Sequence, residues 1–254
     1  MRVLITGASS GIGREFALQY AAAGHDVVLV ARNAEKLHAL AADVHARFGT
    51  DAQVLIADLT NREQLAMVEA RLRDDSSPID VLVNNAGFGT VAPFREVDLD
   101  REQEMVDVLV VAVMRLSAAA LPGMIKRNCG GVIVVSSVAG WFPSGTYSAA
   151  KSWATVFSES VAGELRNTGA HIMALCPGFT VTQFHETAGL DPASVPKFMW
   201  LDVRDVVASA IRDFHRGKVI STPSLRYKTL GWIMRSIPRG VWHKLNMGLS
   251  AQRR

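Results

Sequence analysis

The sequence is short of cysteine and lacks a long apolar run. Only two cysteines, Cys129 and Cys176, occur in 254 residues. Two cysteines are too few to cross-link a disulfide-rich secreted fold, so a reducing, cytoplasmic location is expected. No uninterrupted apolar stretch reaches the roughly 18 residues that a membrane-spanning helix needs. Gly7, Gly11 and Gly13 interrupt the first apolar segment, and this pattern differs from that of a signal peptide.

Metal-ligand spacings are also missing, and the excess of basic residues is not spread over the whole chain. The sequence has no HxxxH or CxxC pair, so we expect no metal site and interpret His185 as an ordinary loop residue. The net charge of +3 is uneven, because residues 222–254 hold seven basic residues and no acidic one, which leaves 20 basic and 24 acidic residues before them. A basic tail without an aromatic–basic platform does not indicate nucleic-acid binding.

Short apolar runs alternate with helical patterns along most of the chain. The runs predict strands at 2–6, 26–31, 52–57, 79–87, 132–137, 171–178 and, more weakly, 218–222. They are rich in Val, Ile and Leu without polar alternation, which is typical of strands buried on both faces. Helices between such strands imply right-handed crossovers. We therefore predict an α/β fold, a single-domain Rossmann-like doubly wound parallel β-sheet with helices on both faces.

This domain is expected to occupy residues 1–221, because no linker, repeat or low-complexity segment interrupts it. Residues 222–254 form a C-terminal extension that mixes Leu, Ile, Met and Trp with Arg and Lys. Three interpretations stay open: contact with a membrane surface, cover for a lipophilic substrate, or packing on the body or on a neighbouring subunit. We favour packing, and Pro238 and Gly240 argue against one long helix.

The stretch TGASSGIG lies directly between the first expected strand and the first expected helix. Gly7 lets the chain turn sharply, Gly11 lets the backbone approach a phosphate, and Gly13 lets the helix pack closely on the strand. The unpaired N–H groups at the start of a helix attract phosphate. In this β-α-β context the stretch predicts a dinucleotide site that is formed by the three glycines together with Ser9, Ser10 and Ile12.

Tyr147 and Lys151 stand four residues apart in TYSAAKSW, so on a helix they share one face. A free tyrosine has a pKa of about 10, and a nearby ammonium lowers that value by stabilising the phenolate. Such a pair can give a proton to a carbonyl oxygen or take one back. The fifth expected strand ends in Ser136 and Ser137, at the carboxyl edge of the sheet where folds of this type bind ligands.

The spacing of TGASSGIG, the NNAG at 84–87 and the Tyr-x-x-x-Lys at 147–151 together resemble the short-chain dehydrogenase/reductase family over about residues 1–221. The resemblance implies an oxidoreductase that interconverts a hydrophobic ketone or aldehyde and its alcohol by hydride transfer. It also implies that Tyr147 is the general acid/base and that Lys151 tunes it and binds the nicotinamide ribose. Ser137 is similar to the family's carbonyl-orienting serine, and Ser136 remains a second candidate.

The resemblance implies roles for the segment after the sixth strand as well. Pro177 and Gly178 shape a turn beside the nicotinamide, while Thr180 and Thr182 either bind the coenzyme or only cap their loop. Residues 183–200 are expected to form a substrate lid with an apolar lining from Phe184, Phe198, Met199 and Trp200. A homodimer or homotetramer built on the helices near 100–126 and 147–167 is implied, although apolar helix faces also serve the core.

Residues around the second and third strands favour NADP(H) over NAD(H). Ala31 stands where the family places an acid against the ribose hydroxyls, and Arg32 follows it. No carboxylate repels a 2′-phosphate there and a guanidinium is available to bind it, so NADP is predicted, with NAD as the alternative. Asp58 either contacts the adenine or caps the next helix. The other coenzyme contacts that the resemblance implies are Leu59, Asn85, Ala86 and Gly87.

One position departs from the family pattern. Leu109 stands where the family usually carries an asparagine that holds a water of the proton relay through the lysine. Leucine offers no polar side chain, so we predict a working Ser–Tyr–Lys set with a modified relay. The competing hypothesis keeps the fold and makes the protein a weakly active or non-catalytic nucleotide-binding module.

Overall fold

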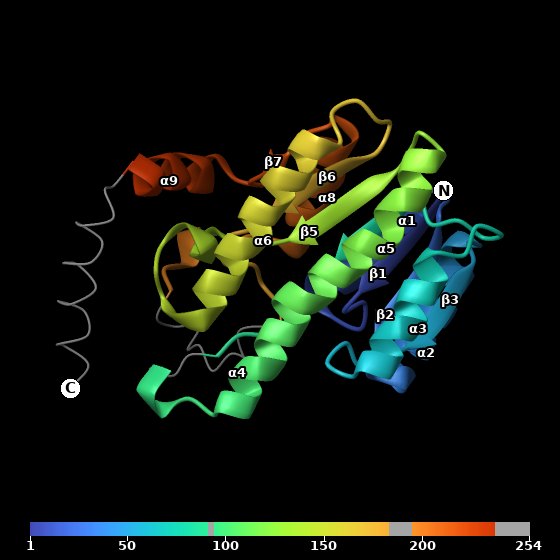
Figure 1. Cartoon of the computed structure of the whole chain (residues 1–254), viewed down its shortest axis with the longest axis horizontal. Coiled ribbons are helices and arrows are strands. Elements are labelled where there is room, and N and C mark those ends of the chain that lie inside the picture. Colours follow the sequence, from blue (N-terminus) through green and yellow to red (C-terminus); the bar gives the residue numbers. More distant parts are fainter. Residues whose placement is uncertain (91–93, 183–194, 237–254) are drawn as a thin grey trace.

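Seven parallel strands form one sheet in the computed structural model, which describes residues 1–90, 94–182 and 195–236 (Figure 1). Their order is β3-β2-β1-β4-β5-β6-β7, and every neighbouring pair runs parallel. This confirms the predicted doubly wound sheet. The strands are β1 (Arg2–Thr6), β2 (Asp26–Ala31), β3 (Ala52–Ile56), β4 (Val81–Asn84), β5 (Gly131–Val135), β6 (His171–Leu175) and the short β7 (Ile220–Ser221).

Helices cover both faces of this sheet. One face carries α1 (Gly11–Ala22), α2 (Ala34–Phe48) and α8 (Val203–His215), and the other carries α3 (Arg62–Leu72), α5 (Val113–Lys126) and α6 (Gly145–Glu164). In Figure 1, α5 and α6 cross in front of the strands. The other helical segments are η1 (Phe94–Glu96), α4 (Leu99–Val106), η2 (Asp107–Ala112), η3 (Val138–Trp141), η5 (Lys197–Met199) and α9 (Leu225–Ser236).

Successive side chains of each strand point to opposite faces and build two cores. In β1, Val3 and Ile5 join the core that holds Phe16 of α1. Leu4, between them, joins the core that holds Leu116 of α5. All five side chains are buried, which explains why the strand sequences lack polar alternation.

The strand order reverses between β1 and β4. The chain builds outward from β1 to β3, crosses back to β4 and continues to β7. Loops that leave neighbouring strands on the two sides of such a switch point diverge, and the crevice between them is where open parallel sheets bind ligands. The glycine loop follows β1 and Asn85 follows β4, so both lie at this crevice.

The segment Leu99–Lys126 is long and apolar enough to cross a membrane by length and composition, with a mean hydropathy of 2.0. The sequence expectation considered only uninterrupted apolar runs and therefore missed it. Half of its apolar window is buried inside the fold. The segment comprises α4, the π-helical η2 and α5, and its inward face forms part of the core beside the sheet.

Candidate functional site

The loop after β1 is tight because its glycines leave no room for side chains. Gly7 and Gly11 have φ angles of 65° and 54°, in the left-handed region that other residues rarely adopt. A Cβ on Gly13 would lie 2.3 Å from the carbonyl oxygen of Gly7, so α1 rests directly on the loop. Ser10 occupies the N-cap position of α1, and its side chain makes no capping hydrogen bond. This leaves the start of α1 suited to a phosphate.

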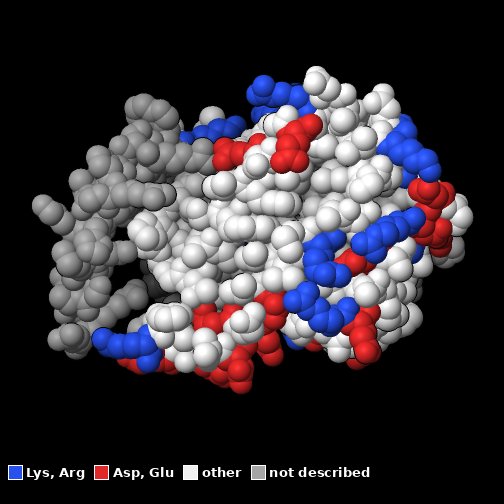
Figure 2. Space-filling model, viewed as in Figure 1, with Lys and Arg blue, Asp and Glu red and all other residues white. Residues whose placement is uncertain are grey.

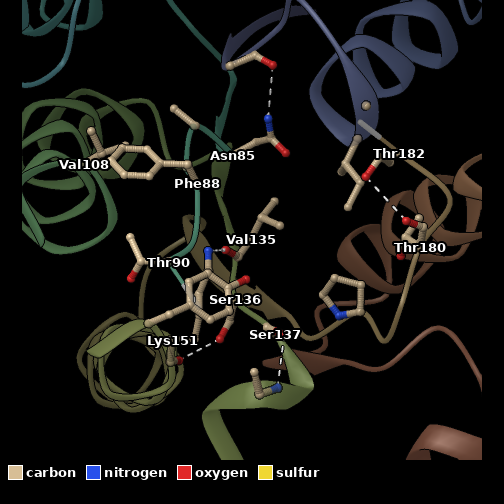
Figure 3. A pocket seen from close by; sticks show the side chains of 18 of the residues that line it. Asn85, Phe88, Thr90, Val108, Val135, Ser136, Ser137, Lys151, Thr180 and Thr182 are labelled. Carbon is tan, nitrogen blue, oxygen red and sulfur yellow. Dashed lines mark hydrogen bonds between the residues drawn. The ribbon is translucent and has the colours of Figure 1, made fainter. Parts of the chain in front are cut away.

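Asn85 fixes the glycine loop to the end of β4. Its Nδ2 donates to the carbonyl oxygens of Thr6 and Gly7 at 2.9 and 3.3 Å. The backbone N–H groups of Asn85 and Ala86 in turn donate to Thr6 Oγ1 at 2.9 and 3.0 Å. Figure 3 shows the Asn85 side chain at the pocket wall. Asn85 therefore shapes the dinucleotide loop, a role that the sequence analysis missed.

A cleft of about 1320 Å³ opens at this edge of the sheet, larger than the roughly 300–1,000 Å³ of a typical small-molecule pocket. It has room for a dinucleotide and a substrate together. All predicted site residues except Gly13 line it, namely Gly7, Ser9, Ser10, Gly11, Ile12, Arg32, Asp58, Leu59, Asn85, Ala86, Gly87, Ser137, Tyr147, Lys151, Pro177, Gly178, Thr180 and Thr182. Gly13 contributes indirectly, because it lets α1 pack closely on the glycine loop.

Arg32 and Asp58 meet beside the ends of β2 and β3. Arg32 Nη1 lies 3.6 Å from Asp58 Oδ2, and the Arg32 side chain is 64% exposed. Burial raises the pKa of Asp58, but hydrogen bonds from Thr60 and the charge of Arg32 outweigh it and hold that pKa below its usual value. Ala31 and Lys36 line the same part of the cleft. The site thus offers two cations where the sequence analysis found one.

Asp58 does not cap the following helix. Asn61 occupies the N-cap of α3 and accepts hydrogen bonds from the N–H groups of Glu63 and Gln64. Asp58 instead accepts from the N–H and the hydroxyl of Thr60 at 3.0 and 2.8 Å. The capping interpretation of Asp58 is therefore wrong, and its contact with the adenine stays a prediction.

Ser137, Tyr147 and Lys151 come together on the cleft wall, where β5 ends and α6 begins. Lys151 Nζ lies 5.7 Å from the centre of the Tyr147 ring and donates to the Val135 carbonyl at 2.7 Å (Figure 3). The Ser137 side chain hydrogen-bonds Tyr147, and its Oγ accepts from the N–H of Ala139 at 3.1 Å. A phenol, a hydroxyl and an ammonium thus lie together on one wall of the cleft.

The Ser136 side chain bonds α6 and not the Tyr147 hydroxyl. Its Oγ donates to the Lys151 carbonyl at 2.7 Å and lies 2.8 Å from Thr155 Oγ1, and the residue is buried. These bonds attach the end of β5 to α6. Of the two candidate serines, only Ser137 contacts Tyr147 through its side chain among the bonds of the described residues.

Burial dominates the electrostatics of the pair on α6. It raises the pKa of Tyr147 to about 12, and the hydrogen bond with Ser137 opposes this only in part. It lowers the pKa of Lys151 to about 8, with a smaller opposing effect from Cys176. Each shift favours the neutral form, as expected for ionisable groups removed from water. Strongly shifted titratable groups in a cleft are typical of functional sites.

Leu109 of η2 lies behind Tyr147 in a small apolar cluster. It is 2% exposed and packs with Met105, Ala150, Phe88 and Tyr147. A Cβ on Gly87 would lie 2.5 Å from Leu109 Cδ2, so the leucine presses on the loop after β4. The segment is π-helical, a geometry that is frequent at functional sites. Leu109 thus forms an apolar plug beside Tyr147, and its effect on the proton relay stays a prediction.

Two threonine side chains of the loop after β6 make local hydrogen bonds. Thr180 Oγ1 donates to the Gly178 carbonyl at 3.0 Å, and Thr182 Oγ1 to the Thr180 carbonyl at 3.4 Å (Figure 3). These are the local bonds of the capping interpretation, while both residues also line the cleft. Their contact with a coenzyme stays a prediction.

Only part of the expected lid lies within the described residues. Phe184 and His185 lie outside them. Met199 lines the cleft, Phe198 is 62% exposed, and Trp200 packs against the Phe179 ring at 5.8 Å. Within the described residues, no group of three or more His, Cys, Asp or Glu side chains could hold a metal ion.

Several residues that line the cleft were not found from the sequence. Lys36 had a usable signal, because it stands on the first turn of α2, directly beyond Arg32 and the N-cap Asn33. The others carry no local motif, because distant parts of the chain bring them to the cleft: Phe88, Thr90, Val108, Phe142, Tyr227 and Leu230.

We expect Lys151→Met to stabilise the ligand-free protein at pH 7 by about 1–3 kcal/mol, because it removes a buried charge. The pKa of Lys151 falls from 10.5 to about 8 on folding, so the unfolded chain binds more protons between these values. Wild-type stability should therefore rise relative to that of the variant as the pH increases from 8 to 10.5. Urea unfolding at several pH values measures both effects.

The exposed Lys126, whose Nζ lies 3.0 Å from Asp75 Oδ2, provides the control. Lys126→Met should change the stability by less than about 1 kcal/mol and keep the pH dependence of the wild type. Equal stability of the Lys151→Met and wild-type proteins across this pH range would show that burial does not destabilise the protonated form of Lys151.

Several known proteins are similar to this chain in sequence and in fold. Residues 1–192 match the short chain dehydrogenase family. A very-long-chain 3-oxoacyl-CoA reductase from Phaeosphaeria nodorum is 34% identical over 68% of this chain, and the match spans 52%, about half, of that relative. A short-chain dehydrogenase from Sphingobium yanoikuyae, solved in complex with NADPH, is 34% identical, with a TM-score of 0.84 over 93% of this chain and 96% of its own.

A bulky-bulky ketone specific alcohol dehydrogenase from Comamonas testosteroni is also similar. It is 29% identical, with a TM-score of 0.80 over 99% of this chain and 93% of its own. The family match covers the glycine loop, the serine–tyrosine–lysine group and the loop after β6. The chain therefore belongs to the short-chain dehydrogenase/reductase family of NAD(P)-dependent oxidoreductases.

Proposed function

We propose that this protein interconverts a hydrophobic ketone or aldehyde and its alcohol with NADP(H). One observation carries the proposal: Tyr147, Ser137 and the buried Lys151 lie together in the same cleft as the glycine loop. The glycine geometry and the uncapped start of α1 fit the phosphates of a dinucleotide. The serine and the phenol then lie where a carbonyl oxygen can be bound and protonated.

Each residue of the group has a distinct task in this proposal. The coenzyme, when bound, supplies or accepts the hydride. Ser137 donates a hydrogen bond to the substrate oxygen and orients the carbonyl, and Tyr147 donates a proton to the same oxygen during reduction. Lys151 holds positive charge beside the phenol, which stabilises the phenolate that remains. In oxidation, that phenolate takes the proton back from the alcohol.

The apolar walls of the cleft support a hydrophobic substrate. Phe88, Val108, Phe142, Met199 and Leu230 line it, and burial of apolar surface is the main source of affinity for ligands without charge. The Comamonas testosteroni protein is named for bulky ketones, and the Phaeosphaeria nodorum protein for a very-long-chain 3-oxoacyl-CoA. Both names are consistent with a large apolar group on the substrate here.

We also propose that the protein works as a homo-oligomer in the cytoplasm. Met114 of α5 and Val156 of α6 are exposed, and the Trp153 and Phe157 rings stack nearby with centres 4.8 Å apart. Figure 2 shows a broad band without charged residues over the face that α5 and α6 occupy. An apolar face of this kind suits a two-fold interface, which light scattering measures directly. Cys129 and Cys176 form no disulfide, which suits a reducing compartment.

Tyr147→Phe should reduce turnover by at least about a hundredfold, because it removes the proton donor. The dissociation constant for NADPH should stay within about twofold of the wild-type value, because the phenyl ring keeps the packing. Loss of NADPH absorbance with a panel of aryl and alkyl ketones measures turnover, and fluorescence titration measures binding. Normal turnover of the variant would show that Tyr147 is not the acid.

Arg32→Ala should weaken NADPH binding by about tenfold or more, because a charge-assisted bond to the 2′-phosphate is lost. Binding of NADH, which lacks that phosphate, should change by less than about twofold. Arg14, another partly exposed arginine paired with an aspartate, offers the control variant Arg14→Ala. A preference for NADH in the wild-type protein, or equal losses for both coenzymes, would favour the NAD alternative.

Leu109→Asn distinguishes a modified relay from lost catalysis. If resupply of the proton through Lys151 limits turnover, the amide should raise kcat, by up to roughly tenfold, while Leu109→Ala should not. If the wild-type protein consumes no NADPH with any carbonyl and Leu109→Asn restores consumption, the nucleotide-binding module is the better description. A wild-type enzyme that neither variant accelerates would mean that the apolar plug does not limit the relay.

A further inference from the structure

Tyr227 of α9 is 2% exposed, although α9 lies beyond residue 192, where the family match ends. Its hydroxyl donates to the Met199 carbonyl at 2.8 Å and accepts from the N–H of Phe179 at 3.1 Å. One side chain therefore bonds the loop after β6 and the segment η5 at once. A buried phenol that satisfies two backbone groups holds them at a fixed separation.

The ring of Tyr227 also occupies the space beside Gly178. A Cβ on that glycine would lie 2.0 Å from a Tyr227 ring carbon, so the ring rests directly on the backbone after Pro177. On the next turn of α9, a Cβ on Gly231 would lie 2.5 Å from the Trp141 ring of η3. Missing side chains on both partners thus let α9 approach the body closely at two points.

A third contact strengthens this attachment. Arg226 Nη1 donates to the Phe198 carbonyl at 2.7 Å, next to the bond that Tyr227 makes to Met199. Tyr227 and Leu230 themselves line the cleft together with Tyr147, Phe142 and Met199. The described part of the C-terminal extension is consequently a wall of the site, between η3 and the loop after β6.

We propose that Tyr227 is a positioning residue that fixes α9 against the loop after β6, and that α9 thereby sets the size of the carbonyl substrate. This inference rests on the proposed function. Bulky apolar ketones that reach past the reacting group would contact the wall formed by Tyr227 and Leu230, whereas small ketones would be held by Ser137 and Tyr147 alone. The wall should therefore affect the binding of large substrates and leave the chemical step unchanged.

Tyr227→Phe tests this with the loss of one hydroxyl. We expect KM for benzophenone to rise about tenfold, the cost of one buried bond pair. We expect kcat, KM for cyclohexanone and the dissociation constant for NADPH to stay within about threefold. Thr229→Val removes an exposed hydroxyl from the same helix, where Thr229 bonds only the Arg226 carbonyl among the described residues, and should change none of these quantities.

Leu230→Trp tests the size of the site without touching the hydrogen bonds. The larger side chain should raise KM for benzophenone by about tenfold or more and leave KM for cyclohexanone within about threefold. Equal losses for both ketones in the two variants would indicate general damage to the fold and would overturn the proposal. Unchanged KM for benzophenone in both variants would overturn it as well.

Hydrogen exchange of the full chain with NADPH bound gives a readout that needs no turnover. The Phe179 amide donates to Tyr227, so its exchange should be accelerated by about tenfold or more in Tyr227→Phe and unchanged in Thr229→Val. If the wild-type protein reduces no carbonyl, the proposed function fails, and the exchange alone decides whether Tyr227 fixes the loop. Unchanged exchange would overturn that role.

Discussion

The site depends on a lysine that is held out of water beside a phenol. Lys151 is buried, and its Nζ donates to the Val135 carbonyl at 2.7 Å. The fall of its pKa from 10.5 to about 8 corresponds to roughly 3 kcal/mol of unfavourable solvation. An apolar side chain at this position would avoid the cost of burying a charge. We therefore interpret the buried charge as serving the proposed proton transfer, at a cost that the two cores must offset.

The surrounding structure fixes the direction of that lysine with short-range contacts. Ser136 joins the end of β5 to the Lys151 carbonyl, and Thr155, one turn further along α6, bonds the same carbonyl at 3.1 Å. A Cβ on Gly140 would lie 2.8 Å from the carbonyl carbon of Lys151, so η3 is pressed against the helix. Since Ser137 is the N-cap of η3, the same contact sets the serine, the tyrosine and the lysine relative to one another.

The sequence was informative where the cause of the structure is local. The strands follow from apolar runs without alternation, and the roles of Gly7 and Gly13 follow from backbone sterics within one loop. Asp58 was wrongly considered as a helix cap. Asn61, three residues later, is the residue that accepts hydrogen bonds from the first N–H groups of α3. Tyr227 could not be found, because its partners Phe179 and Met199 are 48 and 28 residues away and no pattern along the chain connects them. Local sequence patterns therefore predicted the residues that are expected to bind the coenzyme. Residues that are expected to contact the substrate, such as Tyr227, are brought together by tertiary packing and could not be found in the same way.

The apolar plug at Leu109 has a consequence for the acidity of Tyr147. Tyr147 packs against Leu109, Met105 and Ala150, and removal of the phenol from water is the main reason that its pKa lies near 12. A phenol in that state is a weak acid at neutral pH, and nearby positive charge adds to the lowering of its pKa by the Ser137 hydrogen bond. Lys151 carries such a charge when protonated, and an oxidised nicotinamide adds a second. Under the proposed function, the acidity of Tyr147 therefore depends on Lys151 and on the redox state of the bound coenzyme.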